Sequence, residues 1–402
     1  MNIKEEFPLL EKRDIVYLDN AATTQKPPCV IEAANRYYNE NNANPLRGLY
    51  QLSIDATDEY ENARQEVADF IGAKDKAEII FTRNATESLN LVAYAYARNF
   101  LKEGDEVITT IAEHHSDMIP WQQACKATGA HLTYLYCEKD GTMTPDMLEK
   151  IISDKTKIVA VTQVSNVFGR VNDIKGFAEV AHSHGAILVA DGAQSVPHIP
   201  VNVQDLDCDF LAFSGHKMYA PMGIGVLYGK KDLLEKMPPF LFGGEMIEYV
   251  TTEGATWAEL PHKFEAGTVN VGGAVGLGEA IRFMKRFGWD TIEKREEELT
   301  TYAMEKMAAY PHVHIIGSKD PKEHHGIITF TVDDVHPHDC AAIFDEHNVA
   351  VRAGHHCAQP LLKYLGKMST VRASMAFYND KSDIDAFYDA LISIRKEMGY
   401  AD

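Results

Sequence analysis

A lysine and an aspartate stand at the ends of two apolar runs, where their chemistry suits an aldehyde cofactor. Lys217 closes the segment Ser214-Gly215-His216-Lys217, and Asp191 follows the run 187–190. A lysine amine forms a Schiff base with an aldehyde, and a buried aspartate keeps a pyridine nitrogen protonated. Together they predict pyridoxal 5'-phosphate, although singly Lys217 would suit an exposed charge and Asp191 a turn.

The segment 83–89 is a candidate site for the cofactor's phosphate. It follows an expected strand and begins a helix, where free backbone amides and the hydroxyl of Thr86 suit an anion. An ordinary helix N-cap explains the same residues equally well. After the next strand, the imidazole of His114 would stack on a planar ring or move protons. Because adjacent histidines diverge and no other ligand has suitable spacing, we expect no metal site.

Cys357 differs from the other five cysteines in its surroundings. It ends Arg352-Ala353-Gly354-His355-His356-Cys357, where glycine and histidine indicate a loop that solvent can reach. Positive charge from nearby His and Arg side chains would favour the thiolate, which is the nucleophilic form. The others are scattered, as expected of reduced, buried apolar residues: Cys29, Cys125, Cys137, Cys208 and Cys340.

Arg372 lies in a short apolar segment, 371–374, so its charge needs a partner. A substrate carboxylate is a natural bidentate partner for a guanidinium group. A salt bridge between domains explains the residue equally well, and the sequence leaves both roles open.

Apolar and amphipathic segments alternate through the middle of the chain. The expected strands are 78–82, 106–109, 158–162 and 187–190. This alternation predicts a mostly parallel α/β sheet covered on both faces, with ligands at the carboxyl ends of its strands.

From about residue 280 the pattern changes. Charged helices are expected over 281–310, short strands at 326–330 and 349–352, and a final helix over 382–398. We therefore expect a large cofactor-binding domain over 20–285. Residues 1–19 and 286–402 would form a smaller α+β domain that carries the cysteine loop.

The composition excludes some partners. The 402 residues carry a formal net charge of −20, which argues against nucleic acid and anionic membranes. No signal-peptide core and no bilayer-length apolar run occur, so we expect a cytoplasmic protein without membrane contact.

The motifs resemble those of the class V, fold-type I pyridoxal-phosphate enzymes almost end to end. Within that class the chain is most similar to the SUF-type cysteine desulfurases (group II, SufS-like). The shared motifs lie at 17–23, 113–115, 164–167, 191–194, 214–217, 264–268, 352–357 and 372–374. The Arg-x-Gly-His-His-Cys motif is the specific one, because group I enzymes have a longer, serine-rich cysteine loop.

The resemblance implies a fold-type I transferase with a mostly parallel sheet of the seven-stranded type and a smaller C-terminal domain. It also implies which residues bind the cofactor: Thr86, His114, Asn166, Asp191, Gln194, Ser214, His216 and Lys217, with Thr268 reaching the phosphate from a second subunit. His114 would stack on the ring, and Gln194 and Asn166 would lie near its phenolic oxygen.

The implied catalytic residues are Lys217, Cys357 and His114. Lys217 would hold the cofactor and later move the substrate's α proton, while Cys357 would attack the substrate sulfur. Arg372 would bind the substrate carboxylate, with Arg352 and Asn166 beside it.

The implied function is removal of sulfur from L-cysteine, giving alanine and an enzyme persulfide for iron–sulfur cluster assembly. The acceptor would be a protein of SufE or SufU type, and the enzyme a homodimer. A selenocysteine lyase, or another class V lyase or epimerase, is the alternative, with a non-catalytic assembly partner a third. Cys357 favours sulfur or selenium transfer, and retention of the catalytic set argues against the third.

Three positions depart from the family pattern. Leu46 stands where the family commonly has His, and would make the entrance to the site more apolar. Ala85 replaces a common hydroxyl and would cost one hydrogen bond of about 1 kcal/mol. Asp117 replaces a common Asn after the His pair.

Overall fold

The structure, a computed structural model, describes residues 3–400 and contains one large sheet of seven strands in the order β2-β8-β7-β6-β5-β3-β4. Their bounds are β2 Ile79–Thr82, β3 Glu106–Thr110, β4 His131–Leu135, β5 Thr156–Thr162, β6 Ile187–Asp191, β7 Phe210–Ser214 and β8 Gly225–Gly229. Five neighbouring strands run parallel to one another, namely β7, β6, β5, β3 and β4. The strand β8 is antiparallel to both of its neighbours, β7 and β2. The predicted fold class is therefore confirmed.

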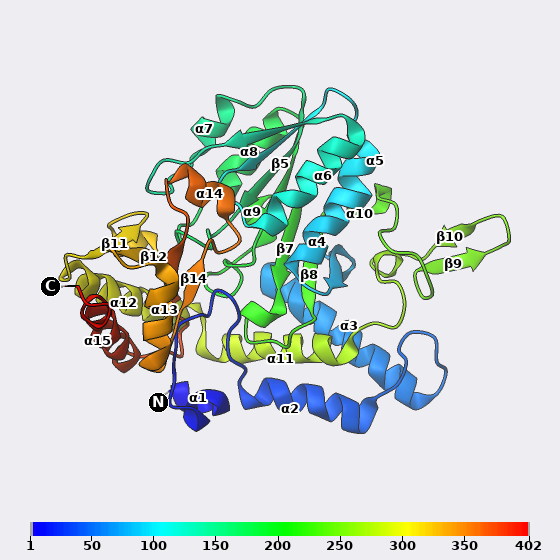
Figure 1. Ribbon diagram of the computed structural model, residues 1–402. Coiled ribbons are helices and arrows are strands. Elements are labelled where there is room, and N and C mark those ends of the chain that lie inside the picture. The colour runs from blue at the N-terminus through cyan, green and yellow to red at the C-terminus, as the bar shows by residue number, and fades with distance from the viewer. Residues whose placement is uncertain (1–2, 401–402) are drawn as a thin grey trace.

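Helices cover both faces of this sheet, which explains why its strands are apolar throughout (Figure 1). Successive residues of β6 pack on opposite sides, Leu188 in one core cluster and Val189 in another. The first face carries α3 Gln51–Ile71, α8 Ile174–Ser183 and α11 Val271–Phe287; the second carries α4 Ala85–Leu91, α6 Ile119–Thr128 and α10 Lys231–Lys236. Both faces are thus buried, as predicted for a parallel sheet.

A second sheet of four antiparallel strands has its own core. Its order is β11 Val313–Ile316, β12 Ile327–Val332, β15 Thr370–Ser374 and β14 Arg352–Gly354. The covering helices are α12 Trp289–Ala308, α13 Pro337–Glu346 and α15 Lys381–Glu397. The division into domains at residues 20 and 285 stays a prediction, which this separate core supports.

The single strand expected over 349–352 is two strands in the structure. Val349–Ala350 forms β13 and pairs in parallel with β1, Val16–Tyr17, whereas β14 pairs with β15. The chain therefore changes sheets just before the cysteine loop, which hydrophobicity alone did not indicate.

The charged segment after residue 280 belongs to two helices that meet at Gly288. This residue has φ of 76°, a left-handed conformation that suits glycine and separates α11 from α12. The start of α11 was not predicted from the sequence, because its first turns are rich in glycine. A Cβ on Gly276 would lie 2.6 Å from Pro221, so close packing requires glycine there.

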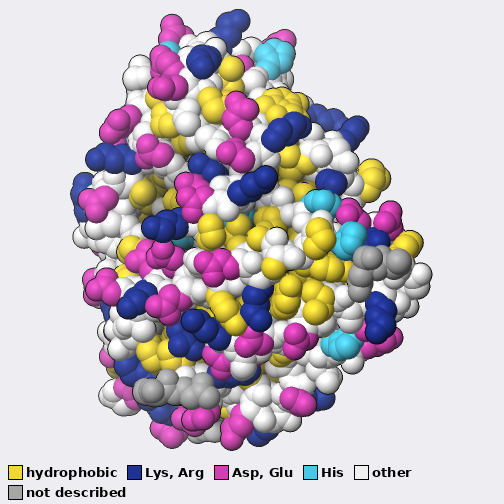
Figure 2. Space-filling model, turned by 90° about the vertical axis from the view of Figure 1, so that its left-hand side faces the viewer, with side chains coloured by type: hydrophobic (Ala, Val, Ile, Leu, Met, Phe, Trp, Pro, Cys, Tyr) yellow, Lys and Arg dark blue, Asp and Glu magenta, His cyan; other side chains and the backbone are white. Residues whose placement is uncertain are grey.

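The hairpin of β9 (Ile247–Val250) and β10 (Ala255–Trp257) projects from the body at the right of Figure 1. On the side of α12 and α15, acidic and basic side chains are interspersed over the surface (Figure 2). Within residues 3–400 no helix has both the length and the apolar character needed to cross a membrane.

Candidate active site

A cavity of about 220 Å³ lies at the carboxyl ends of the parallel strands. Nearly all the site residues expected from the sequence line it: Thr86, His114, Asn166, Asp191, Gln194, Ser214, His216, Lys217, Arg352, Cys357 and Arg372. The position agrees with the rule that open α/β sheets bind ligands outside these strand ends.

Lys217 and Asp191 reach the cavity from neighbouring strands. Asp191 is the last residue of β6, and the backbone N–H of Ala193 donates to its Oδ1 at 2.9 Å. β7 ends at Ser214, and the turn Gly215–Lys217 carries the lysine. Burial lowers the pKa of Lys217 to about 8, with Asp191 opposing that shift, so a neutral amine is accessible near neutral pH.

The pKa of Asp191 itself is raised by burial, against the hydrogen bond from Ala193 and the charge of Lys217. The residue is only 4% exposed and lines the cavity. A cationic ring nitrogen placed beside it would stabilise the charged carboxylate.

His114 presents a neutral imidazole to the cavity. Its Nδ1 accepts a hydrogen bond from the backbone N–H of Ser116 at 3.1 Å. Burial, and then the charge of Lys217, lower the pKa of His114 to about 3. A neutral ring held in this way suits stacking on an aromatic ligand.

Small polar groups gather near the start of α4. The hydroxyls of Thr86 and Ser116 hydrogen-bond at 2.7 Å, and the Ser214 hydroxyl accepts from the N–H of Ala85 at 2.8 Å. Ser116 also lines the cavity, and its place after the His pair is the only feature of the sequence that points to it.

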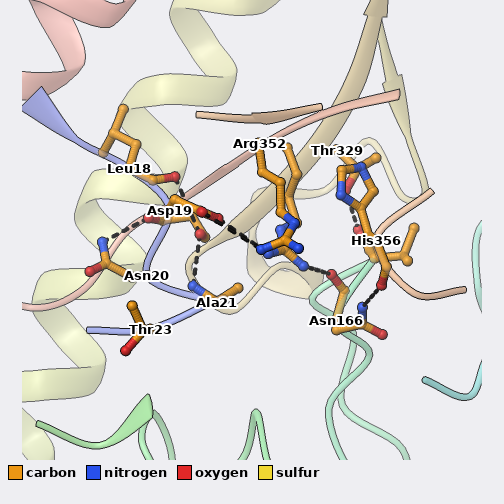
Figure 3. A network of polar contacts seen from close by, with 12 residues as sticks. Leu18, Asp19, Asn20, Ala21, Thr23, Asn166, Thr329, Arg352 and His356 are labelled. Carbon is orange, nitrogen blue, oxygen red and sulfur yellow. Dashed lines mark hydrogen bonds and ion pairs between the residues drawn. The ribbon is translucent and has the colours of Figure 1, made fainter. Parts of the chain in front are cut away.

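The loop of Cys357 is held through its backbone carbonyls by residues that follow β3 and β5. The side chain of Asn166 donates to the carbonyl of His356 at 2.7 Å, as Figure 3 shows. The N–H of His115 donates to the carbonyl of Cys357 at 2.7 Å. His356 and Cys357 are both left-handed, with φ of 51° and 55°. These contacts hold a strained loop that turns the thiol toward the cavity.

Cys357 is half-buried at this cavity, while the other cysteines lie elsewhere. Burial raises the pKa of each of their thiols: Cys29, Cys125, Cys137, Cys208 and Cys340. A raised pKa makes a thiol a poor nucleophile at neutral pH.

Arg372 brings a buried cation to the cavity from β15. It is 3% exposed, and its Nη2 lies 3.4 Å from Oδ1 of Asp19. The exposed Arg352 lies 3.8 Å from the other oxygen of Asp19, and Figure 3 shows these two residues side by side. Asp19 lies in the sequence motif 17–23, but no role for it is predicted from the sequence. Burial lowers the pKa of Arg372 to about 10, with Asp19 opposing the shift, so the group stays cationic at neutral pH.

Several polar atoms of the cavity wall are buried without a hydrogen-bond partner among the described residues. They are Gln194 Oε1, His216 Nδ1, His356 Nδ1 and Arg372 Nε. An unpaired buried polar group costs about 1–3 kcal/mol, so this wall is suited to a polar ligand. Pyridoxal phosphate fits the donor set, because a lysine amine, a carboxylate and groups suited to an anion share one cavity.

Two residues expected to affect the site lie away from this cavity. Thr268 lines a separate pocket with Phe240 and Asn270, and its action from a second subunit stays a prediction. Leu46 has φ of 77° and hydrogen-bonds to Thr57 through its N–H at 2.7 Å. Its effect on the entrance also stays a prediction. Within residues 3–400, no three His, Cys, Asp or Glu side chains are grouped to hold a metal ion.

Comparison with known proteins agrees with this geometry. The family described as aminotransferase class-V matches residues 16–387. A probable cysteine desulfurase from Halalkalibacterium halodurans is 53% identical over 99% of this chain and 98% of its own. Two solved structures each cover 98% of both chains. The apo cysteine desulfurase of Thermococcus onnurineus NA1 has a TM-score of 0.94 at 42% identity. The Escherichia coli cysteine desulfurase CsdA, in S-sulfonic acid form, has a TM-score of 0.91 at 40% identity.

Proposed function

Since the chain belongs to the class V aminotransferase family and is a cysteine desulfurase, we propose that Cys357 takes the sulfur of L-cysteine as a persulfide. The observation that carries the proposal is that Cys357, Lys217 and Arg372 line one cavity. A nucleophile, a base and a carboxylate-binding cation thus surround the space for a small amino acid.

The cofactor is pyridoxal phosphate, and residues that line the cavity would hold it. Asp191 would pair with the ring nitrogen, and His114 would stack on the ring. Thr86, Ser214 and His216 would hold the phosphate, and Gln194 and Asn166 would lie near the phenolic oxygen. The unpaired Nδ1 of His216 and Oε1 of Gln194 support these roles, because a bound ligand would supply their partners.

Bound pyridoxal phosphate supplies an electron sink that makes the substrate's α proton acidic and its β bond breakable. Arg372 orients the substrate by its carboxylate, with Arg352 and Asn166 nearby. The neutral amine of Lys217 takes the α proton, a role that its pKa of about 8 favours.

Cys357 then attacks the substrate sulfur as a thiolate. The new sulfur–sulfur bond forms as the carbon–sulfur bond breaks, and the bonding electrons stay with the carbon fragment. Protonation of that fragment gives alanine, so one cysteine and one enzyme thiol become one alanine and one persulfide. No external oxidant is needed.

The persulfide passes to an acceptor in iron–sulfur cluster assembly, of SufE or SufU type. The position of Cys357 supports transfer to a protein, because this cysteine is only partly buried on its loop and an acceptor can reach it. The active unit is a homodimer, in which Thr268 reaches the partner's phosphate site. Exposed apolar side chains support a contact between copies: Leu49 at 97%, Met222, Phe242, Tyr249, Val250 and Trp257.

Selenocysteine lyase activity is the second candidate, because the same thiol and cavity would accept a selenium atom. The test is to supply L-cysteine and L-selenocysteine separately, to quantify alanine, and to locate any persulfide by peptide mass spectrometry. We expect alanine from L-cysteine and a sulfur adduct on Cys357. Alanine from selenocysteine alone would favour the alternative, and no alanine from either would exclude both.

A further inference from the structure

Two buried carboxyl groups lie together behind the cavity wall. Glu113 and Asp117 flank His114 and Ser116, and both side chains are 0% exposed. Their carboxyl groups lie within hydrogen-bonding reach of one another. Two ionised carboxylates cannot hydrogen-bond to one another, because each only accepts, so a bond between them requires one proton.

The outer oxygen of each carboxyl group is held by neutral donors. Oε1 of Glu113 accepts from the hydroxyl of Thr110 at 2.6 Å and from the N–H of Thr162 at 3.0 Å. Oδ1 of Asp117 accepts from the indole N–H of Trp121 at 2.9 Å. The other two oxygens, Oε2 of Glu113 and Oδ2 of Asp117, are buried and receive no N–H or O–H donor from the described residues.

The pair is in contact with the strand ends that carry the site. Thr162 is the last residue of β5 and stands opposite Asp191 in the register of β5 with β6. The N–H of Gln163, the next residue, donates to the carbonyl of Asp191 at 2.9 Å. Glu113 therefore fixes the backbone immediately beside Asp191.

The surrounding charges favour retention of the proton. From β6, Asp191 faces both carboxyl groups with like charge, while Thr110 on β3, Thr162 on β5 and Trp121 on α6 supply uncharged donors. Burial raises the pKa of Glu113 to about 8. Burial and the neighbouring Glu113 and Asp191 raise that of Asp117 well above its usual value.

We propose that Glu113 and Asp117 share one proton through Oε2 and Oδ2, and that this acid pair positions the end of β5 and limits the negative charge around Asp191. Both are positioning residues, acting through Thr162 and Asp191. The shared proton does not depend on which atom the enzyme transfers.

The shared proton has a direct spectroscopic signature in the full-length enzyme with its cofactor bound. Infrared spectra at neutral pH should contain a protonated-carboxyl carbonyl band that disappears in both Asp117→Asn and Glu113→Gln. Asp154→Asn, at a fully exposed carboxylate, should leave that band unchanged. A band absent from the parent enzyme, or retained in both buried variants, would overturn the proposal.

A double substitution tests the geometry independently. In each single variant one amide NH₂ replaces the shared proton as donor, so both should remain folded with the cofactor bound. The double variant places two NH₂ groups face to face, since the outer oxygens keep their donors. We expect a fall in its unfolding midpoint well beyond the sum of the singles. If both carboxyls were ionised instead, each single variant and the double would raise the midpoint.

The cofactor itself reports the charge next to Asp191. As the pH rises, loss of the shared proton adds a negative charge in the parent enzyme but not in Asp117→Asn. We therefore expect an alkaline transition in the cofactor's absorption that the variant lacks. Identical pH titrations of the two proteins would contradict the proposed effect on Asp191, without bearing on the desulfurase reaction.

Discussion

Arg372 donates a hydrogen bond of 3.0 Å from Nη1 to the carbonyl oxygen of Asn166, and this contact joins β15 of the four-stranded sheet to the loop that follows β5 of the seven-stranded one. The same guanidinium group lies beside Asp19 and keeps its Nε unpaired within the described residues. Arg372 is thus already fixed in orientation while one donor remains for a ligand. This arrangement suits recognition of a small carboxylate.

Replacement of Arg372 by Lys should weaken use of L-cysteine. Hydrogen bonds to charged groups contribute about 1.5–3 kcal/mol, which corresponds to a fall in kcat/KM of roughly 10- to 100-fold. Steady-state alanine formation measures the effect. Arg352→Lys is the matched control, because its side chain is 44% exposed and should show the smaller loss. A larger loss in the control would reverse the two assignments.

The amine of Lys217 should control how fast the cofactor is taken up by cofactor-free enzyme. Only the neutral amine attacks an aldehyde, and the pKa of Lys217 is lowered to about 8 by burial. The rate of appearance of the cofactor's visible band should rise with pH and level off above about 8. Lys217→Ala should give no band that borohydride removes; a normal band there would refute this role.

The stability of the protein should depend on pH through Glu113. Its pKa is about 8 in the folded protein, above the ordinary value of 4.5, so the folded state binds the proton more tightly. The resulting stabilisation is complete below pH 4.5 and is lost as the pH rises through 8. The loss is at most about 1.4 kcal/mol per pH unit.

Denaturant unfolding across this pH range, compared with Glu113→Gln, measures that contribution. The free energy of unfolding of the parent should fall relative to the variant as the pH rises. Parallel pH profiles would show that Glu113 does not titrate in this range.

The loop leading to Thr268 depends on a buried ion pair. Glu265 accepts from Arg64 at 2.6 and 2.8 Å, from the Tyr60 hydroxyl at 2.8 Å and from the N–H of Phe81 at 2.7 Å. Removing one partner of a buried pair costs about 3–5 kcal/mol. Glu265→Ala should therefore lower the denaturant midpoint strongly. Glu279→Ala, which breaks the exposed pair with Arg282, should cost less than about 1 kcal/mol; equal effects would contradict the role of Glu265.

The sequence was sufficient to identify the site residues whose chemistry is unusual in their local context. Lys217, Asp191 and Cys357 each followed an apolar run or stood in a glycine–histidine loop, and strand ends place such residues at one edge of a parallel sheet. The parallel sheet itself followed from continuous apolar strands.

Contacts between distant segments could not be predicted from the sequence. Asp19 gained a role only when β15 brought Arg372 beside it, 353 residues away in the chain. The pairing of Glu113 with Asp117 became visible only when the packing of β3, β5 and α6 excluded other donors. The break between β13 and β14 depends on which strands they pair with, and a short apolar run contains no such information.

Peptide mass mapping of the enzyme after a single exposure to L-cysteine identifies the thiol that takes the sulfur. We expect one added sulfur on the peptide containing Cys357, matched by one alanine per active site. Cys357→Ala should keep the cofactor band but form no persulfide and lose alanine turnover. A persulfide on a different cysteine, or normal alanine turnover in Cys357→Ala, would contradict the assignment of Cys357 as the sulfur acceptor.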